Sequence, residues 1–430
     1  MQEKLIARDL LDTLMSNMDR KEAVAIRGPR QSGKTTLLEM LRARLLDKGT
    51  DEDDITQLSF EDPAVLDEFA KDPRAYLSTF VKGSRKHYFL LDEVQYDKQA
   101  GKRLKLLYDS VPDIKLIVTG SSTLDISKIA TFLVGRVFLY ELLPLSFAEY
   151  LRHENQRLYA IFSANHREIA GLLLKGKKPR FDKVSVAEVE SHAEQYIRFG
   201  GYPAVVMSEG APKKIEVLKN IYITYLEKDI PGIFGITDTQ SMRKTILNLA
   251  LNMGNLLDYN SISADTGLYY SKLMRYLSIL QDTYIIRLVA PFYKNRLTEL
   301  RKNKKLYFLD TGIRNYIVQN FNALDKREDS GRLFENFVST ELHLIAAPTQ
   351  SINYWRTTAK AEVDFVFGSP NFLTPIEVKR TVLKKPVVER SMQSFMKAYR
   401  PKNAVVFGRG TINGTRLGPT NIHFPSISFL

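Results

Sequence analysis

Residues 24–36, which read VAIRGPRQSGKTT, are the stretch whose residue types most clearly indicate chemistry. An apolar run enters a loop of the pattern G-x-x-x-x-G-K-[ST], and an amphipathic stretch follows. Glycines let the loop's N–H groups face phosphate oxygens, and the next helix directs its positive end at the same place. Lys34 can then reach the β- and γ-phosphates, and the Thr35 hydroxyl can bind Mg²⁺. We predict an ATP·Mg²⁺ site formed by Gly28, Pro29, Arg30, Gln31, Ser32, Gly33, Lys34, Thr35 and Thr36.

Two carboxylates follow another apolar run, at residues 87–93. Buried parallel strands carry such acids to the carboxyl edge of a sheet, beside a bound nucleotide. Asp92 is predicted to hold Mg²⁺ through water, and Glu93 to polarise the attacking water. A later apolar run ends in Thr119-Gly120-Ser121-Ser122. A hydroxyl there, with Ser121 the leading candidate, could sense the γ-phosphate or align the attacking water. An ordinary turn at the end of a strand explains the pattern equally well.

A second acidic group lies near the C-terminal end of the sequence. Asp364 sits in the apolar run 361–367, and the next strand-like run contains Glu377 and Lys379, which alternation places on one face. Glu335, on a predicted helix at 333–344, can complete the group. Carboxylates suit Mg²⁺ or Mn²⁺, and a lysine can orient or deprotonate a metal-bound water that attacks a phosphodiester. The alternative is a set of charges at a strand edge, or a fold kept only for binding.

Several neighbouring side chains could assist this second group. Gln393 could support it from a following helix, and three basic residues could contact a nucleic-acid backbone, although a solvated helix start explains them as well. These three are Lys384, Lys385 and Arg390.

The composition limits the class of protein. A chain of 430 residues with 44% hydrophobic residues can form about three domains. The sequence has no cysteine, which excludes disulfides and thiolate zinc sites and fits the cytoplasm. We expect no export signal and no membrane span, which requires about 20 apolar residues. The formal net charge of +13 favours a polyanionic partner, with nucleic acid first and an anionic membrane surface second.

The middle of the chain reads as helices up to residue 235 and then changes pattern. Three predicted helices over 246–280 precede two apolar strands, which is the plan of a winged helix whose third helix can enter the DNA major groove. Lys272 and Arg275 lie off the buried stripe of that third helix. The connector between the strands could contact phosphates through Lys294, Arg296, Arg301, Lys302, Lys304 and Lys305. The alternative is a spacer or a protein-docking module.

These motifs together resemble the AAA+-type P-loop ATPases of a bacterial and archaeal family that carries a C-terminal domain of unknown function. The resemblance implies a doubly wound sheet followed by a helical lid, and a possible homo-oligomer. It also implies that Arg136 acts on the γ-phosphate, in cis or from a neighbouring subunit. Asp364 with Glu377-x-Lys379 resembles the PD-(D/E)xK nuclease superfamily, the fold that the family carries in its C-terminal part. Further motifs in the resemblance are Asp92-Glu93-Val94-Gln95, Thr119-Gly120-Ser121-Ser122, Gly135-Arg136 and residues 144–150.

We therefore predict an α/β protein with four parts: an AAA+ ATPase core at 1–150, a helical lid at 151–235, a winged helix-turn-helix at 236–321 and a nuclease-like domain at 322–430. The leading hypothesis is an ATP-hydrolysing DNA-associated enzyme that couples the ATPase to a metal-dependent endonuclease. An ATP-dependent DNA-binding switch with a catalytically silent nuclease fold is the alternative. An RNA-directed nuclease is a third possibility, because phosphate chemistry does not reveal the sugar.

Overall fold

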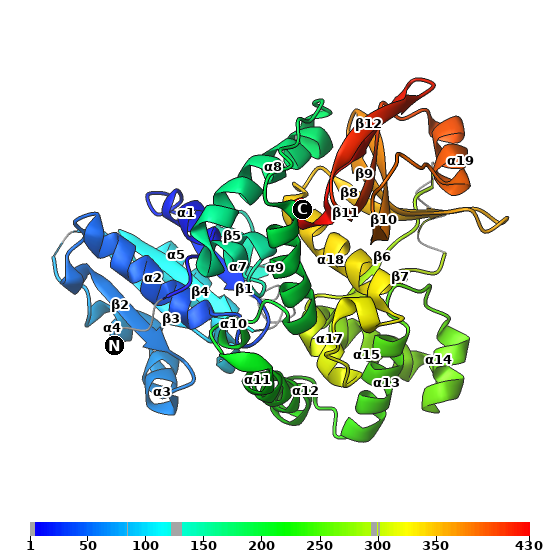
Figure 1. Ribbon diagram of the computed structural model, residues 1–430. Helices are drawn as coiled ribbons and strands as arrows, with labels where there is room; N and C mark the ends of the chain where they lie inside the picture. Colours follow the sequence, from blue (N-terminus) through cyan, green and yellow to red (C-terminus); the bar gives the residue numbers. More distant parts are fainter. Residues whose placement is uncertain (1–4, 84, 122–130, 294–298, 300–301) are drawn as a thin grey trace. The chain divides into compact units, whose positions relative to one another are not determined.

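The computed structural model describes residues 5–83, 85–121, 131–293, 299 and 302–430 (Figure 1). The chain divides into two compact units, one of Met1–Leu145 with Asp282–Tyr284 and one of Ser146–Gln281 with Ile285–Leu430. Each unit has its own sheet and its own buried apolar clusters.

The first unit is built on a five-stranded parallel sheet with the order β2-β3-β4-β1-β5. Its strands are β1 (Ala23–Arg27), β2 (Ile55–Ser59), β3 (His87–Asp92), β4 (Ile114–Gly120) and β5 (Val137–Glu141). Its helices are α1 (Leu10–Met15), α2 (Lys34–Asp47), α3 (Pro63–Lys71), α4 (Pro73–Ser78) and α5 (Ala100–Ser110), with the 3₁₀ turns η1 (Glu52–Asp54) and η2 (Val94–Tyr96). The expected α/β fold with a parallel sheet is thereby confirmed for this unit.

Apolar clusters cover both faces of this sheet, because successive strand residues point to opposite sides. Ala23 and Ala25 of β1 pack in the cluster that includes α3, α4 and α5, whereas Val24 and Ile26 pack in the cluster that includes α1 and α2. A strand buried on both faces needs apolar side chains at every position, which is why β1, β3 and β4 read as nearly continuous apolar runs.

The second unit begins with helices. They are α7 (Phe147–Glu154), α8 (Gln156–Lys175), α9 (Val186–Phe199), α10 (Pro203–Val206), α11 (Gly210–Thr224), the π-helical η3 (Tyr225–Asp229) and α12 (Ile230–Phe234). Helix α7 starts with a capping box, in which the Ser146 side chain accepts the Glu149 N–H and the Glu149 carboxylate accepts the Ser146 N–H.

Three more helices and an antiparallel strand pair follow. The helices are α13 (Thr239–Leu251), α14 (Tyr259–Thr266) and α15 (Tyr270–Asp282), and the strands are β6 (Ile286–Val289) and β7 (Lys305–Phe308). Gly267, which follows the last residue of α14, takes a left-handed conformation and caps the helix.

The C-terminal part is a six-stranded mixed sheet with the order β12-β13-β11-β10-β9-β8. Its strands are β8 (Ser351–Arg356), β9 (Glu362–Ser369), β10 (Phe372–Val382), β11 (Asn403–Arg409), β12 (Ile412–Leu417) and β13 (Thr420–Phe424). The accompanying helices are α17 (Thr311–Ile317), η4 (Leu324–Lys326), α18 (Ser330–Ile345), α19 (Arg390–Tyr399) and η5 (Ile427–Phe429). Trp355 and Val363 pack against Met392 and Phe395 of α19 on one face of the sheet. None of the helices in the described ranges is long and apolar enough to cross a membrane.

Candidate functional site

The loop between β1 and α2 is shaped by glycine at both ends. A Cβ at Gly28 would lie 2.0 Å from the carbonyl oxygen of Leu142, so no side chain fits there. Gly33 has a φ of 92°, in the left-handed region that glycine adopts without strain. Because α2 begins at Lys34, its first N–H groups point into the loop. The backbone thus has the form that phosphate binding at a helix start requires.

Lys34 is almost completely buried inside this loop. Its ammonium donates to the carbonyl oxygens of Gly28 at 3.2 Å and Pro29 at 3.0 Å, and it lies 3.9 Å from a carboxylate oxygen of Glu93. The buried Ser32 Oγ has no hydrogen-bond partner among the described residues. A buried hydroxyl without a partner costs free energy, which a phosphate oxygen would recover. The residues of the loop therefore fit a nucleoside triphosphate.

Asp92, at the end of β3, is held by two hydroxyl groups. Thr35 Oγ1 donates to Asp92 Oδ2 at 2.6 Å, and the Thr119 hydroxyl donates to Asp92 Oδ1. Hydroxyl and carboxylate oxygens are the donors that Mg²⁺ prefers, so Thr35 and Asp92 fit as its ligands. A bound Mg²⁺ would neutralise charge on the phosphate oxygens.

Glu93 is fixed from several sides. Ser121 Oγ donates to both carboxylate oxygens of Glu93 at 3.1 Å, and the Gln95 side chain donates to Glu93 Oε2. The backbone N–H of Glu93 donates to Thr119 Oγ1 at 3.1 Å. Its φ of 55° is uncommon for a residue other than glycine and is maintained by these contacts. The structure thus brings Glu93 and Ser121 together beside Lys34, whereas Ser122 lies outside the described residues.

Sequence reasoning assigned no role to Thr119 or Gln95. Thr119 had a detectable signal, because parallel β3 and β4 end side by side and a hydroxyl at the end of one strand can reach an acid at the end of the other. Gln95 follows Glu93 by two residues in a 3₁₀ turn, and no pattern in the sequence predicts that contact.

Arg136 lies at the wrong edge of the sheet for a role in cis. It precedes β5, whose first residue pairs with Ala23 at the start of β1, and its carbonyl accepts the Ala23 N–H. The phosphate loop follows the other end of β1, about 13 Å further along the strand at ~3.3 Å per residue. The Arg136 guanidinium is 3.4 Å from Asp109. The expected action in cis is therefore wrong, and action from a neighbouring subunit stays a prediction.

The C-terminal acidic group lies on two adjacent strands. Antiparallel β9 and β10 pair Phe365 with Ile376, which places Asp364 opposite Glu377. Asp364 Oδ2 accepts the Val378 N–H at 2.8 Å. The Lys379 ammonium lies 2.8 Å from Glu377 Oε1, and it also pairs with Glu389 at 2.6 Å. The three motif residues are thus near one another, as alternation along the strands implies.

A buried lysine that was expected to contact DNA occupies the middle of this group. Lys305, at the start of β7, is 2% exposed, and its ammonium lies 2.8 Å from Glu335 Oε1, 2.6 Å from Glu362 Oε1 and 4.0 Å from Asp364 Oδ1. Tyr307 OH also donates to Glu335 Oε1, at 2.5 Å. The prediction that Lys305 contacts phosphates is therefore wrong, because its charge is already paired inside the protein.

Burial and charge set the protonation of this acidic group. Desolvation raises the pKa of Asp364 well above its ordinary value, and the negative charges of Glu335 and Glu377 raise it further. Desolvation also raises the pKa of Glu377, although the Lys379 ammonium opposes that shift. The pKa of Lys305 is raised because the three carboxylates outweigh desolvation. The ammonium of Lys305 thus supplies the positive charge that these buried acids need.

The expected metal site at Glu335, Asp364 and Glu377 is not supported by this geometry. Within the described ranges, no three histidine or acidic side chains are arranged to hold a metal ion. Lys305 takes one oxygen of Glu335 and lies beside Asp364, and Lys379 takes one oxygen of Glu377. In this arrangement the carboxylates are paired with the ammonium groups of Lys305 and Lys379 rather than placed to bind a divalent ion.

Gln393, which was predicted to support this group, is bonded elsewhere, whereas the contact of three basic residues with a nucleic-acid backbone stays a prediction. Gln393 donates to the carbonyl oxygen of Val388 at 2.9 Å. Lys384, Lys385 and Arg390 are exposed.

The remaining predicted DNA contacts have mixed environments. Lys272 Nζ pairs with Asp238 at 2.7 Å, and this contact lowers the pKa of Asp238 to about 2. Arg275 donates to the Phe234 carbonyl oxygen at 3.0 Å. Lys302 is exposed and Lys304 is partly exposed. Arg301, Lys294 and Arg296 lie outside the described residues.

Comparison with known proteins assigns the first unit. Residues 20–151 match the model of an AAA domain, while residues 190–324 and 330–425 match two domains of unknown function, DUF8612 and DUF4143. The AAA match covers the phosphate loop and both strand-end acids. Residues 20–151 are therefore a P-loop ATPase domain of the AAA type, as the sequence motifs predicted.

Related chains span nearly the whole length. An uncharacterized protein of Methanocaldococcus jannaschii is 28% identical over 414 residues, covering 92% of this chain and 82% of the relative. An uncharacterized protein of Haemophilus influenzae is 26% identical over 395 residues, covering 88% of each chain. Among solved structures, a Walker-type ATPase of Pyrococcus abyssi is similar with a TM-score of 0.46 and 13% identity, covering 74% of this chain and 97% of that chain.

Proposed function

We propose that this protein is an ATP-hydrolysing, DNA-associated switch whose C-terminal domain holds nucleic acid without cutting it. The observation that carries this proposal is the different use of two buried lysines. Lys34 lies in a phosphate loop beside Glu93, whereas Lys305 is paired with the acids of the C-terminal group. The first arrangement suits turnover of a triphosphate, and the second suits a stable, neutralised core.

In the ATPase domain each residue has a distinct task. The loop N–H groups and Lys34 bind the phosphates, and Thr35 with Asp92 would hold the Mg²⁺. Glu93, oriented by Ser121 and Gln95, accepts a hydrogen bond from the attacking water and polarises it. Arg136 acts from a neighbouring subunit, so the proposal includes a homo-oligomer.

Association with DNA is supported by charge and by the order of elements. The chain has a formal net charge of +13. Helices α13 to α15 followed by the β6–β7 pair have the order of a winged helix, in which α15 is the helix that enters the major groove. Arg275 and Lys302 are exposed and can contact phosphates.

A second candidate is a Mg²⁺- or Mn²⁺-dependent endonuclease. The observation that favours it is the placement of Asp364 opposite Glu377 with Lys379 at 2.8 Å, together with Glu377 Oε2, which is buried with no hydrogen-bond partner in the described part of the chain. This function requires Lys305 to leave the acidic group.

Stimulation of ATP turnover by nucleic acid tests the proposal. The purified protein is assayed with ATP and Mg²⁺, alone and with single-stranded DNA, duplex DNA or RNA of matched sequence. We expect DNA to raise the turnover rate, with Lys34→Ala inactive throughout. A turnover rate that no nucleic acid changes would contradict the association with DNA, and a response to RNA alone would identify RNA as the partner.

A further inference from the structure

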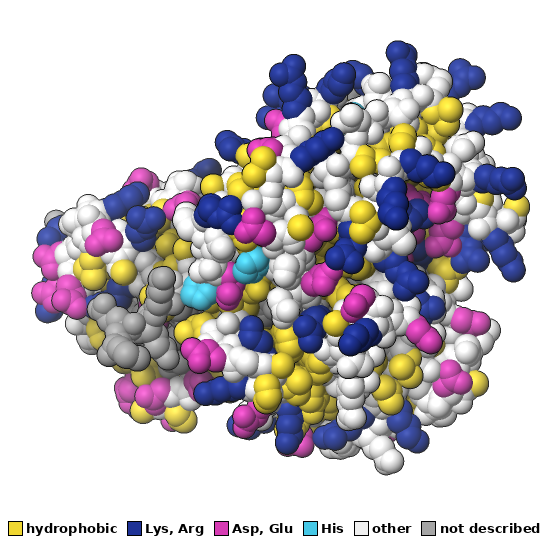
Figure 2. Space-filling view, in the orientation of Figure 1, with side chains coloured by type: hydrophobic (Ala, Val, Ile, Leu, Met, Phe, Trp, Pro, Cys, Tyr) yellow, Lys and Arg dark blue, Asp and Glu magenta, His cyan; other side chains and the backbone are white. Residues whose placement is uncertain are grey.

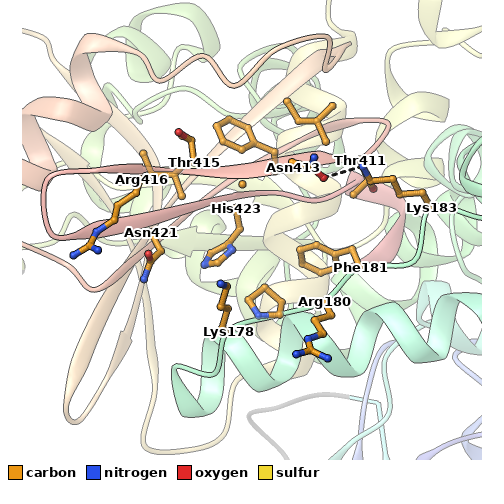
Figure 3. Close-up of a pocket in the computed structure, with 15 residues that line it drawn as sticks. Lys178, Arg180, Phe181, Lys183, Thr411, Asn413, Thr415, Arg416, Asn421 and His423 are labelled. Carbon is orange, nitrogen blue, oxygen red and sulfur yellow. Dashed lines mark hydrogen bonds between the residues drawn. The ribbon is translucent and has the colours of Figure 1, made fainter.

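A basic hollow in the C-terminal part of the second unit lies between the segment after α8 and the β12–β13 hairpin (Figure 3). It has a volume of about 490 Å³. Four cationic side chains line it, Lys178, Arg180, Lys183 and Arg416, and the described residues of its wall include no Asp or Glu. An anionic ligand is the class that this lining favours, because a low-dielectric hollow with charge of one sign concentrates the opposite charge.

The two walls of the hollow present different groups. Figure 3 shows Lys178, Arg180 and Phe181 on the segment after α8, with Arg416, Asn421 and His423 across from them on the hairpin. Lys183 donates to Asn413 Oδ1 at 3.0 Å, which ties the segment to the hairpin, and Arg416 Nε donates to the carbonyl oxygen of Gly418 at 3.1 Å. These hydrogen bonds hold two of the cations in place before a ligand arrives.

The acidic residue nearest in sequence to the cations of the first hollow is hydrogen-bonded outside it. Asp182 lies between Phe181 and Lys183 but does not line the hollow, and its carboxylate accepts the Val184 N–H at 3.0 Å. His423 is 7% exposed, and desolvation with the charge of Lys178 lowers its pKa to about 4. The ring is therefore neutral at pH 7, and with Phe181 it offers an aromatic surface rather than another charge.

A second hollow of about 460 Å³ shares Lys178 and Arg180 with the first. It is also lined by Arg167, Lys175 and Lys177. Its carboxylate, Glu168, accepts the backbone N–H of Arg180 at 2.8 Å. In Figure 2, Lys and Arg side chains gather along the edge where Figure 1 places the end of α8 and β12. The cations thus continue from one hollow into the next.

We infer that these two hollows bind successive nucleotides of a single-stranded nucleic acid. Lys178 and Arg180, which both hollows share, would contact the backbone phosphates, as would Arg416 of the hairpin. The wall of Phe181 and His423 would contact a base. Positive grooves with aromatic surfaces are the usual means of binding single strands. A base can enter such a hollow with its phosphate only when the base is unpaired, so the inference predicts that a duplex binds more weakly than a single strand. The inference extends the proposed association with nucleic acid by assigning a contact to the C-terminal part.

Binding of a fluorescein-labelled oligothymidylate to the full chain, followed by anisotropy without ATP, tests this inference. The pocket variant is Lys178→Glu with Arg416→Glu, both exposed positions. The matched control is Lys213→Glu with Lys219→Glu, which changes the net charge equally on exposed positions of α11 that do not line either hollow. Urea unfolding followed by Trp355 fluorescence checks that the C-terminal sheet of each variant still folds, and unchanged ATP turnover checks the ATPase domain.

We expect the pocket variant to bind the strand about tenfold more weakly and the control to bind within about twofold of the parent. The plot of log K against log salt should also lose about 1.4 from its slope in the pocket variant, since each phosphate contact contributes ~0.7 for a single strand. If thymidine monophosphate competes as strongly as the oligonucleotide, the site binds free nucleotides, and the inference that it binds a single strand is overturned.

Equal effects of the pocket variant and the control would show only a general charge effect and overturn the inference. So would tighter binding of the same strand in a duplex. Loss of strand binding at the pocket with normal ATP stimulation by duplex DNA would leave the proposed switch intact. Normal pocket binding without any ATP stimulation would instead refute the switch alone.

Discussion

The phosphate loop and the C-terminal acidic group both place a buried lysine near carboxylates, but the two lysines have different partners. Lys34 donates to two neutral carbonyl oxygens and lies 3.9 Å from Glu93, whereas Lys305 lies 2.6 and 2.8 Å from two carboxylates. Breaking one member of a buried ion pair leaves an uncompensated charge, while weaker polar contacts can be exchanged for those of a ligand. We therefore expect Lys34 to bind a substrate and Lys305 to stabilise the fold.

Lys34→Ala should have the largest effect on activity and a small one on stability. ATP turnover is expected to fall to background, because an electrostatic contact to the transition state is removed, and losses of a hundred- to a thousandfold or more are typical for such contacts. Steady-state turnover and urea unfolding of the same preparation check this. Turnover equal to that of the parent would refute the assignment of the loop.

Lys305→Met should lower the stability of the protein strongly, in contrast to Lys34→Ala. Removing the ammonium leaves the largely buried carboxylates of Glu335 and Asp364 without their cation, whereas Glu362 keeps Arg356 at 3.2 Å. The expected cost is about 3–5 kcal/mol. Trp355 is the single tryptophan and lies in the core of the same sheet, so its fluorescence during urea unfolding reports this part of the chain.

The Lys305→Met deficit should shrink as the pH is lowered. Burial already raises the pKa of Asp364 and Glu377, so the folded variant takes up protons more readily than the unfolded chain, and its stability falls as pH rises. Lys34→Met is the matched control, with a smaller change expected. A Lys305→Met protein as stable as the parent at every pH would contradict the role given to this lysine.

Glu341 shows what burial does to a carboxyl group that has a like charge nearby. It is buried in α18, and desolvation, with repulsion from Glu149, raises its pKa to about 8, although the Phe147 N–H opposes the shift. The folded state therefore keeps a proton that the unfolded chain loses near pH 4.5, so this group's contribution to stability falls as pH rises from about 4.5 to about 8.

Glu341→Gln keeps an oxygen for the Phe147 N–H and cannot ionise. Relative to the parent, it should gain about 3 kcal/mol in unfolding free energy between pH 5 and pH 8, at ~1.4 kcal/mol per pKa unit. Urea unfolding followed by Trp355 fluorescence measures the difference. Exposed Glu216→Gln is the control and should show no such gain. Parallel pH profiles for Glu341→Gln and the parent would contradict the raised pKa.

The smallest expected effect concerns α15. Lys272 and Arg275 already have partners within the protein, so changing both to Ala should weaken duplex binding only about three- to tenfold and lower the salt slope by about 1 to 2. Anisotropy titrations over a salt series measure both quantities. An unchanged affinity with an unchanged slope would show that α15 is not the DNA contact.

Contiguous motifs made the ATPase site predictable, and long-range packing made the rest difficult. Gly28 to Thr36 form one loop, and Asp92 and Glu93 follow a buried strand, so local pattern determines their place. Lys305 is 30 residues from Glu335, and only tertiary packing brings them together. A partial signal existed, because Lys305 alternates with Tyr307 on one strand and Glu362 with Asp364 on another. Nothing in the sequence indicates that the face of β7 with Lys305 packs beside the face of β9 with Asp364.

Register explains the fate of Arg136 in the same way. Its position in the sequence, shortly before an apolar strand, is compatible with either edge of the sheet. The parallel pairing of β5 with β1 decides the question, because it fixes Arg136 beside the start of β1. The basic hollow was not predicted either, since Lys178 and Arg416 come from segments that only the fold places together.

The most direct test is cleavage of end-labelled single- and double-stranded DNA with Mg²⁺ or Mn²⁺, with and without ATP. The parent protein is run beside Asp364→Ala, and ATP turnover is measured in the same tubes. We predict ATP turnover by both proteins and no cleavage by either, because Lys305 already neutralises the acidic group. Cleavage by the parent that disappears in Asp364→Ala would contradict this account and establish a working nuclease.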